Sequence, residues 1–246
     1  MNRILALYIF LLLCGTVSAQ QIVEWSDLQT ITDNSRRTVY YKKGRKQPLR
    51  GKYRIGRGLD EECVKFSVGM INGDYRRYRD GVLRESGIYA KGKRNSTFTE
   101  YYQDGVTPRK ETPMQQGKID GTVKTYFRNG KIEAEKEYKQ SVESGRERRF
   151  DSKTGEQIFE SHYIDGKKDG EEWEIFEDAS TLRSRIIRHY RNGKLDGSYR
   201  VESTRDGKPY ITIEGQYTDG EKSGQWIEHN YDNNTQTCTW HGEGGA

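Results

Sequence analysis

The sequence predicts an all-β fold: an elongated antiparallel meander of stacked β-hairpin repeats, with about eight units of 23 to 27 residues. Three observations support this prediction. An aromatic residue followed three positions later by glycine recurs at nearly constant spacing along most of the chain. Asn-Gly and Asp-Gly pairs, which suit tight hairpin turns, lie between these sites. Several segments alternate apolar and polar residues, as half-buried strands do.

The composition excludes two other classes of protein. The 246 residues are 32% hydrophobic and 32% charged, with 27 Gly and 17 Tyr. Too few aliphatic side chains are present to fill a thick helical or α/β core. The formal net charge of +5 is also too small for plain disorder, which combines low hydrophobicity with high net charge. The composition therefore favours a thin sheet rich in Tyr and Gly.

The N-terminus has the pattern of a targeting segment. Arg3 precedes an apolar run over residues 4–13, and small residues end at Ala19. This order is typical of a secretory signal peptide, and the run is too short to span a bilayer. We expect cleavage near Ala19 and a protein exported to the periplasm, the cell surface or the medium. The alternatives are a retained anchor and a lipoprotein modified at Cys14, which the bulky Leu13 disfavours.

A period of about 25 residues organises the rest of the chain into a lead-in (20–40), a repeat array (41–237) and a C-terminal tail (238–246). In every unit but the first, where Pro48 intervenes, a second small residue follows the anchor glycine after four positions. The anchor pairs are Tyr41/Gly44, Phe66/Gly69, Tyr89/Gly92, Tyr163/Gly166, Tyr190/Gly193 and Tyr217/Gly220, with Met114/Gly117 and Tyr138/Ser141 as degenerate copies.

Each unit reads as two short strands joined by a turn. The return strands over 132–138 and 211–217 alternate clearly, and each ends at an anchor Tyr. Tyr75 and Tyr78 are three residues apart, so either both sheet faces are aromatic or a bulge intervenes. Pro108 and Pro113 cannot donate ladder hydrogen bonds, so we expect the least regular pairing over 106–113.

The segments 163–173 and 217–226 resemble MORN repeats, and they are closest to the bacterial variant, which is often filed as an antitoxin component. The resemblance implies a twisted sheet of stacked hairpins and a generally non-enzymatic scaffold for protein–protein contacts; some family members are linked to phospholipids. It implies that the recurring aromatic residues build the fold. The structural anchors are Tyr41, Phe66, Tyr89, Tyr138, Tyr163, Tyr190, Tyr217, Trp173 and Trp226.

The sequence predicts no catalytic, cofactor-binding or metal-binding residue. His162, His189, His229 and His241 share no metal-ligand spacing, and Cys238 with His241 would supply two ligands where a tetrahedral site needs four. We expect His162 and His189 to be solvated or to take part in hairpin pairing. Cys63 and Cys238 lie at opposite ends of the array, so no intrachain disulfide is expected.

Charge is concentrated in one segment. Residues 36–57 hold ten basic residues and no acidic one: Arg36, Arg37, Lys42, Lys43, Arg45, Lys46, Arg50, Lys52, Arg54 and Arg57. Such a run can hold a polyanion, such as an acidic glycan, lipid head groups or nucleic acid. The other interpretation is a solvated cap that protects an exposed sheet edge with charge.

The functional prediction is an exported, non-enzymatic repeat scaffold that mediates protein–protein interaction. Two alternatives stay open. One is a membrane-surface or polyanion binder acting through residues 36–57. The other is a toxin-neutralising, antitoxin-like or immunity-like partner protein. The expected partner is an unidentified protein, with an anionic lipid or glycan as a second possibility, and no cofactor or small-molecule substrate is implied.

Overall fold

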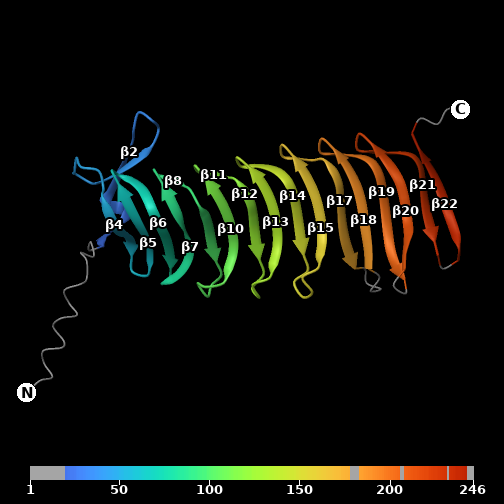
Figure 1. Ribbon diagram of the computed structural model, residues 1–246, viewed down its shortest axis with the longest axis horizontal. Helices are drawn as coiled ribbons and strands as arrows, with labels where there is room; N and C mark the ends of the chain where they lie inside the picture. The colour runs from blue at the N-terminus through green and yellow to red at the C-terminus, as the bar shows by residue number, and fades with distance from the viewer. Residues whose placement is uncertain (1–19, 178–182, 206–207, 232, 243–246) are drawn as a thin grey trace, which may run out of the picture. The chain divides into compact units, whose positions relative to one another are not determined.

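The computed structural model describes residues 20–177, 183–205, 208–231 and 233–242, so the predicted leader lies outside the described residues. The chain divides into two compact units: residues up to Ser96 together with Gln103–Gly105, and Thr97–Tyr102 together with the residues from Val106 onward. Nearly all of the structure is β, and most consecutive strands within each unit pair antiparallel (Figure 1). The predicted hairpin meander is confirmed in both units.

The N-terminal unit contains one meander, one separate hairpin and one short helix. Strands β4 to β8 pair in sequence order, β1 joins the outer edge of β4 in parallel, and β2 pairs with β3. Its elements are β1 (Gln21–Val23), η1 (Trp25–Asp27), β2 (Leu28–Thr32), β3 (Thr38–Lys42), β4 (Gly51–Arg57), β5 (Asp60–Ser67), β6 (Met70–Arg79), β7 (Val82–Ala90) and β8 (Lys93–Arg94). No helix among the described residues is long and apolar enough to cross a bilayer.

The C-terminal unit continues the same pattern, and its strands follow one another in sequence order in Figure 1. They are β9 (Thr97–Tyr101), β10 (Pro108–Gln115), β11 (Lys118–Ile119), β12 (Gly121–Tyr126), β13 (Ile132–Lys139), β14 (Val142–Phe150), β15 (Gln157–Ile164), β16 (Lys167–Lys168), β17 (Gly170–Glu177), β18 (Arg183–Arg191), β19 (Lys194–Arg205), β20 (Lys208–Thr218), β21 (Glu221–Asn230) and β22 (Thr235–His241). Strand β22 extends four residues beyond the predicted array boundary at 237.

The 25-residue period corresponds to a hydrogen bond between successive repeats. In six repeats the backbone N–H of the turn residue donates to a carbonyl shortly after the turn of the preceding repeat, and this turn residue has a positive φ, a conformation that favours glycine. Ser141 does the same in a degenerate copy, with φ of 72° and a 2.7 Å bond to Ile119. The equivalent bonds are Gly69 to Leu49 (2.7 Å), Gly92 to Ile71 (2.8 Å), Gly166 to Glu143 (2.8 Å), Gly193 to Lys168 (2.7 Å) and Gly220 to Leu195 (2.8 Å).

Bulges are a regular part of this sheet. Arg77 pairs with Glu85 and Tyr78 pairs with Leu83, so Arg84 is an extra residue on β7. Between Tyr75 and Tyr78, β6 pairs with β5 without a register shift, so these two side chains face opposite sides of the sheet, which is the first of the two predicted alternatives. The predicted irregularity over 106–113 is present as a register shift between Pro108 and Lys110. Similar shifts occur in most other hairpins, including those of β12 with β13 and β19 with β20. The proline-containing hairpin is therefore one irregular hairpin among several.

The core is built from one position in each repeat, which we call the core position: the residue two places after the second small residue. The residues at the core position are all buried except Tyr199, which is half-buried. The anchor aromatic of the following repeat packs on several of these residues. Phe66 lies 5.4 Å from Tyr53 between ring centroids, and Tyr217 lies 5.7 Å from Tyr199. The core-position residues are Tyr53 and Tyr75 in the N-terminal unit, and Phe98, Val123, Glu147, Glu172, Tyr199 and Trp226 in the C-terminal unit.

Two repeat assignments differ in the structure. In the first repeat the second small residue is Gly51, seven positions after Gly44, with φ of 98°. The residues inserted between them form a loop that contains Pro48. Trp173 and Trp226 are also not equivalent. Trp226 is at a core position and is 5% exposed, whereas Trp173 stands one residue further along, on the opposite face, because Glu172 takes the core position.

Candidate functional site

The loop between β3 and β4 is the strongest candidate site, and its backbone is held firmly. Leu49 is 4% exposed; its N–H donates to the Tyr40 carbonyl at 2.9 Å, and its carbonyl accepts from Gly69 at 2.7 Å. Pro48 forms a bridge with Tyr41. At the start of the loop, the backbone N–H of Arg45 donates to the Lys42 carbonyl at 3.0 Å. The backbone is thus held at both ends of the loop, and residues 43–47 between them are exposed.

These side chains surround a hollow of about 730 Å³, which we call the basic hollow. Four cationic residues from the predicted run line it: Lys42, Arg45, Lys46 and Arg50. The remaining lining residues are Gln21, Gly44, Gln47, Pro48, Leu49 and Tyr53, so no carboxylate is among them. The Lys42 Nζ is 3.1 Å from the Gln21 Oε1 and 5.9 Å from the centre of the Tyr53 ring. The arrangement can accept an anionic group without displacing an internal ion pair.

The other six basic residues of the run do not line this hollow. Arg36 and Arg37 lie in the turn between β2 and β3, where Arg37 forms an ion pair with Asp33 at 2.7 Å. Hydrogen bonds from Arg37 hold the pKa of Asp33 below its usual value. Arg54 is engaged with Glu61 at 2.6 Å. Lys43 is on the loop but outside the lining, Lys52 is on β4, and Arg57 ends that strand.

The buried charges of the C-terminal unit were not anticipated from the sequence. Glu147 is 9% exposed and Glu172 is 1% exposed, at core positions where most other repeats carry aromatic or aliphatic side chains. Cross-strand pairing places Lys136 beside Glu147, Glu147 beside Ser161, and Glu172 beside Arg188. We call these five residues the polar core segment. A signal was present in the sequence, because counting two residues from Gly145 and Gly170 reaches a glutamate each time.

Each buried carboxylate is compensated by cations and by an anchor Tyr. Glu147 is 3.0 Å from Lys136 and 3.1 Å from Arg149, and it accepts a 3.1 Å hydrogen bond from Tyr163. Burial alone raises the pKa of the Glu147 carboxyl, but the hydrogen bonds and charges of Lys136 and Arg149 outweigh it, so the pKa is lowered overall. Burial and the Glu147 charge raise the pKa of Tyr163 to about 12.

Glu172 repeats this arrangement with different partners. It forms ion pairs with Lys168 and, at 2.8 Å, with Arg188, and it accepts a 3.3 Å hydrogen bond from Tyr190. Burial raises the pKa of its carboxyl, yet Lys168, Arg188 and the nearby Ser161 hydroxyl together lower it. The polar core segment therefore places charge inside the sheet in a compensated form.

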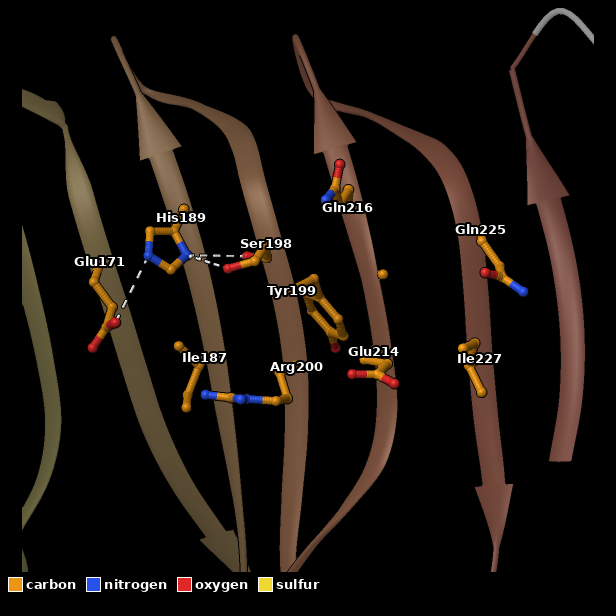
Figure 2. Close-up of a pocket in the computed structure, with 11 residues that line it drawn as sticks. Glu171, Ile187, His189, Ser198, Tyr199, Arg200, Glu214, Gln216, Gln225 and Ile227 are labelled. Atoms are coloured by element: carbon orange, nitrogen blue, oxygen red, sulfur yellow. Dashed lines mark hydrogen bonds and ion pairs between the residues drawn. The ribbon is translucent and has the colours of Figure 1, made fainter. Parts of the chain in front are cut away.

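A second hollow, of about 470 Å³, lies on the face of β17 to β21 opposite the core positions (Figure 2). It contains a Glu171–His189–Ser198 series that has the composition of a catalytic triad. The His189 Nε2 is 3.7 Å from the Glu171 Oε2, and the His189 Nδ1 is 3.0 Å from the Ser198 Oγ. The same Nδ1 is 3.1 Å from the Ser198 carbonyl oxygen.

The His189 Nδ1 is within hydrogen-bond distance of both the Ser198 hydroxyl and the Ser198 carbonyl oxygen, and the ring tautomer decides which of the two it bonds. On the other side of the ring, the 3.7 Å between the His189 Nε2 and the Glu171 Oε2 is longer than a hydrogen bond, so the series lacks the carboxylate–histidine bond of a catalytic triad. His162 makes the corresponding contact to the Glu171 carbonyl at 3.3 Å. Both histidines thus contact the backbone of the neighbouring strand beside a bulge glycine.

The remaining sequence candidates are dispersed. Phe66 is buried, and Tyr41, Tyr89, Tyr138, Tyr163, Tyr190 and Tyr217 are half-buried. Cys63 and Cys238 are free thiols. Within the described ranges, no three His, Cys, Asp or Glu side chains are grouped so that they could hold a metal ion.

The chain matches no protein-family model, and no curated protein matches it.

Proposed function

We propose that this chain is an exported, non-enzymatic binding scaffold that holds an anionic partner macromolecule in the basic hollow. One observation carries the proposal: Lys42, Arg45, Lys46 and Arg50 converge on one hollow whose lining contains no carboxylate. Cations gathered in a concave site raise the local concentration of anions and steer them to it. Export is supported by the leader pattern of residues 1–19 alone.

The scaffold role is supported by the way the hairpins are held together. Successive repeats bond to one another, and anchor aromatics pack on the core position of the repeat before, so many of the recurring residues are engaged in the fold. In the most enzyme-like group, the His189 Nε2 and the Glu171 Oε2 are 3.7 Å apart, beyond hydrogen-bond distance. These contacts favour binding over catalysis.

The experiment compares two variants with the same change in net charge. The hollow variant carries Lys42→Gln, Arg45→Gln, Lys46→Gln and Arg50→Gln, and the matched control carries Arg36→Gln, Lys43→Gln, Lys52→Gln and Arg57→Gln. Binding is measured to immobilised heparin, to polyglutamate and to vesicles with and without anionic lipid. Salt is varied because ionic contacts weaken as it rises.

We expect the hollow variant to bind at least about tenfold more weakly at low salt, since each cation facing an anionic surface contributes on the order of 1 kcal/mol. The control should lose much less. The probe that responds identifies the partner class as an acidic glycan, an acidic protein segment or a lipid surface. Equal losses in the two variants, or no binding to any of the probes, would overturn the proposed function.

A further inference from the structure

The last strand of the C-terminal unit has one partner. Strand β22 pairs with β21 along its whole length, from Thr235 opposite Asn230 to His241 opposite Gly224. No other strand among the described residues pairs with it. Backbone N–H and C=O groups along its outer side are therefore available for a further strand.

The side chains of β22 do not protect this edge. Proteins usually blunt an exposed edge with charged residues, proline or a covering segment. The strand reads Thr-Gln-Thr-Cys-Thr-Trp-His and contains no Lys, Arg, Asp, Glu or Pro. Trp240 is 75% exposed, and every other side chain of the strand except His241 is exposed as well. The β-branched Thr residues favour strand pairing.

The three central residues of β22 read the same in both directions. Cys238 is the fourth of seven residues, and Thr237 and Thr239 flank it. In an antiparallel pair of two such strands centred on Cys238, Thr237 of one copy faces Thr239 of the other, and Gln236 faces Trp240. No charged residue of β22 opposes a like charge, and Thr–Thr cross-strand pairs are favourable.

A head-to-tail arrangement onto the N-terminal meander is disfavoured. On its outer side β4 pairs at Tyr53–Ile55 with β1, which has only three residues, so this edge offers β22 fewer backbone partners than a second β22 does. We propose that β22 is a self-association edge, at which two copies of this chain pair their β22 strands antiparallel about Cys238. Such an isologous contact closes on itself and yields a dimer.

The size of the contact sets the expected affinity. A pair of seven-residue strands buries less than the roughly 1,600 Å² of a standard interface, so we expect a dissociation constant in the micromolar range.

Sedimentation of the purified chain over a wide concentration range should show a monomer–dimer equilibrium. Thr237→Lys, which places a charge at the centre of the edge, should yield a monomer with an unchanged far-UV spectrum. Thr30→Lys, at an exposed strand Thr of the N-terminal unit, is the matched control and should still dimerise.

Cysteine pairs test the register. In a chain lacking Cys63 and Cys238, we expect Gln236→Cys mixed with Trp240→Cys to form disulfide-linked dimers on treatment with diamide as the oxidant. Each variant alone should stay uncrosslinked, because its own cysteines would lie four strand positions apart. A monomer at every concentration, a dimer that survives Thr237→Lys, or cross-linking of Gln236→Cys with itself would overturn the proposal. These readouts do not depend on the basic hollow.

Discussion

Tyr163 donates a hydrogen bond from its hydroxyl to the Glu147 Oε2 over 3.1 Å, and this bond joins the anchor of one repeat to the core position of the repeat before it. Tyr190 makes the same contact to Glu172 at 3.3 Å. In another repeat Tyr217 packs its ring on Tyr199 instead. The period thus preserves a contact between positions while the chemistry at the core position changes, and tyrosine suits both because its ring is apolar and its hydroxyl is polar.

Removing a buried carboxylate should destabilise the C-terminal unit strongly. Glu172→Ala leaves Lys168 and Arg188 without their shared partner inside the sheet, which we expect to cost about 2–4 kcal/mol of unfolding free energy. The matched control is Glu156→Ala, which breaks the exposed 2.9 Å pair with Arg183 and should cost at most about 1 kcal/mol. Urea titration measures both, and similar losses in the two variants would contradict the compensated-charge account.

The free energy of unfolding should fall in acid because of the two buried carboxylates, Glu147 and Glu172. Glu147 and Glu172 have pKa values lowered by the fold, so their stabilising contribution is complete above the unfolded value of about 4.3 and is lost as the pH falls through the folded values. We expect the difference in unfolding free energy between the natural chain and a Glu147→Gln/Glu172→Gln variant to shrink below about pH 4.3. A difference that stays constant from pH 7 to acid would rule out these groups as the cause.

Gly215 is required by the ring beside it. A Cβ at this position would lie 2.3 Å from the Trp226 ring, closer than any side-chain atom can approach. Gly215→Ala should therefore destabilise the chain by about 1–3 kcal/mol, the range seen for overpacked sites. Adding Trp226→Leu should recover much of that loss, and a double-mutant cycle in denaturant measures the coupling. Purely additive effects would show that the ring is not the cause.

Ser198 should not react as a catalytic nucleophile. Its neighbour His189 is 3.7 Å from Glu171, beyond hydrogen-bond distance, so no carboxylate orients the imidazole as a base for the hydroxyl. We expect a fluorophosphonate probe to label the natural chain no more than the Ser198→Ala variant, as measured by intact-protein mass spectrometry. Labelling that disappears in Ser198→Ala would contradict the non-enzymatic scaffold.

Much of the architecture could be predicted because turns and strand periods are local properties. Glycine at positions of positive φ and the aromatic three residues before it mark six of the eight repeats, and even the replacement by Ser141 keeps the turn. The role of Gly51 was missed because the loop inserted before it moves the second small residue out of the regular frame. The non-equivalence of Trp173 and Trp226 was missed because a shift of one residue reverses the face of a strand, and aromatic content alone does not reveal that shift.

The all-β class, the hairpin repeat and the location of the basic run could be predicted from the sequence, since each depends on residues close together along the chain. Which cations converge depends on how the loop packs against the sheet. Lys42, Arg45, Lys46 and Arg50 share one hollow because Leu49 fixes their loop to the sheet, while Arg37 and Arg54 are held by carboxylates elsewhere. The compensation of Glu147 and Glu172 likewise depends on packing, because Lys136 and Arg188 come from neighbouring strands and reach these carboxylates only when the strands pair.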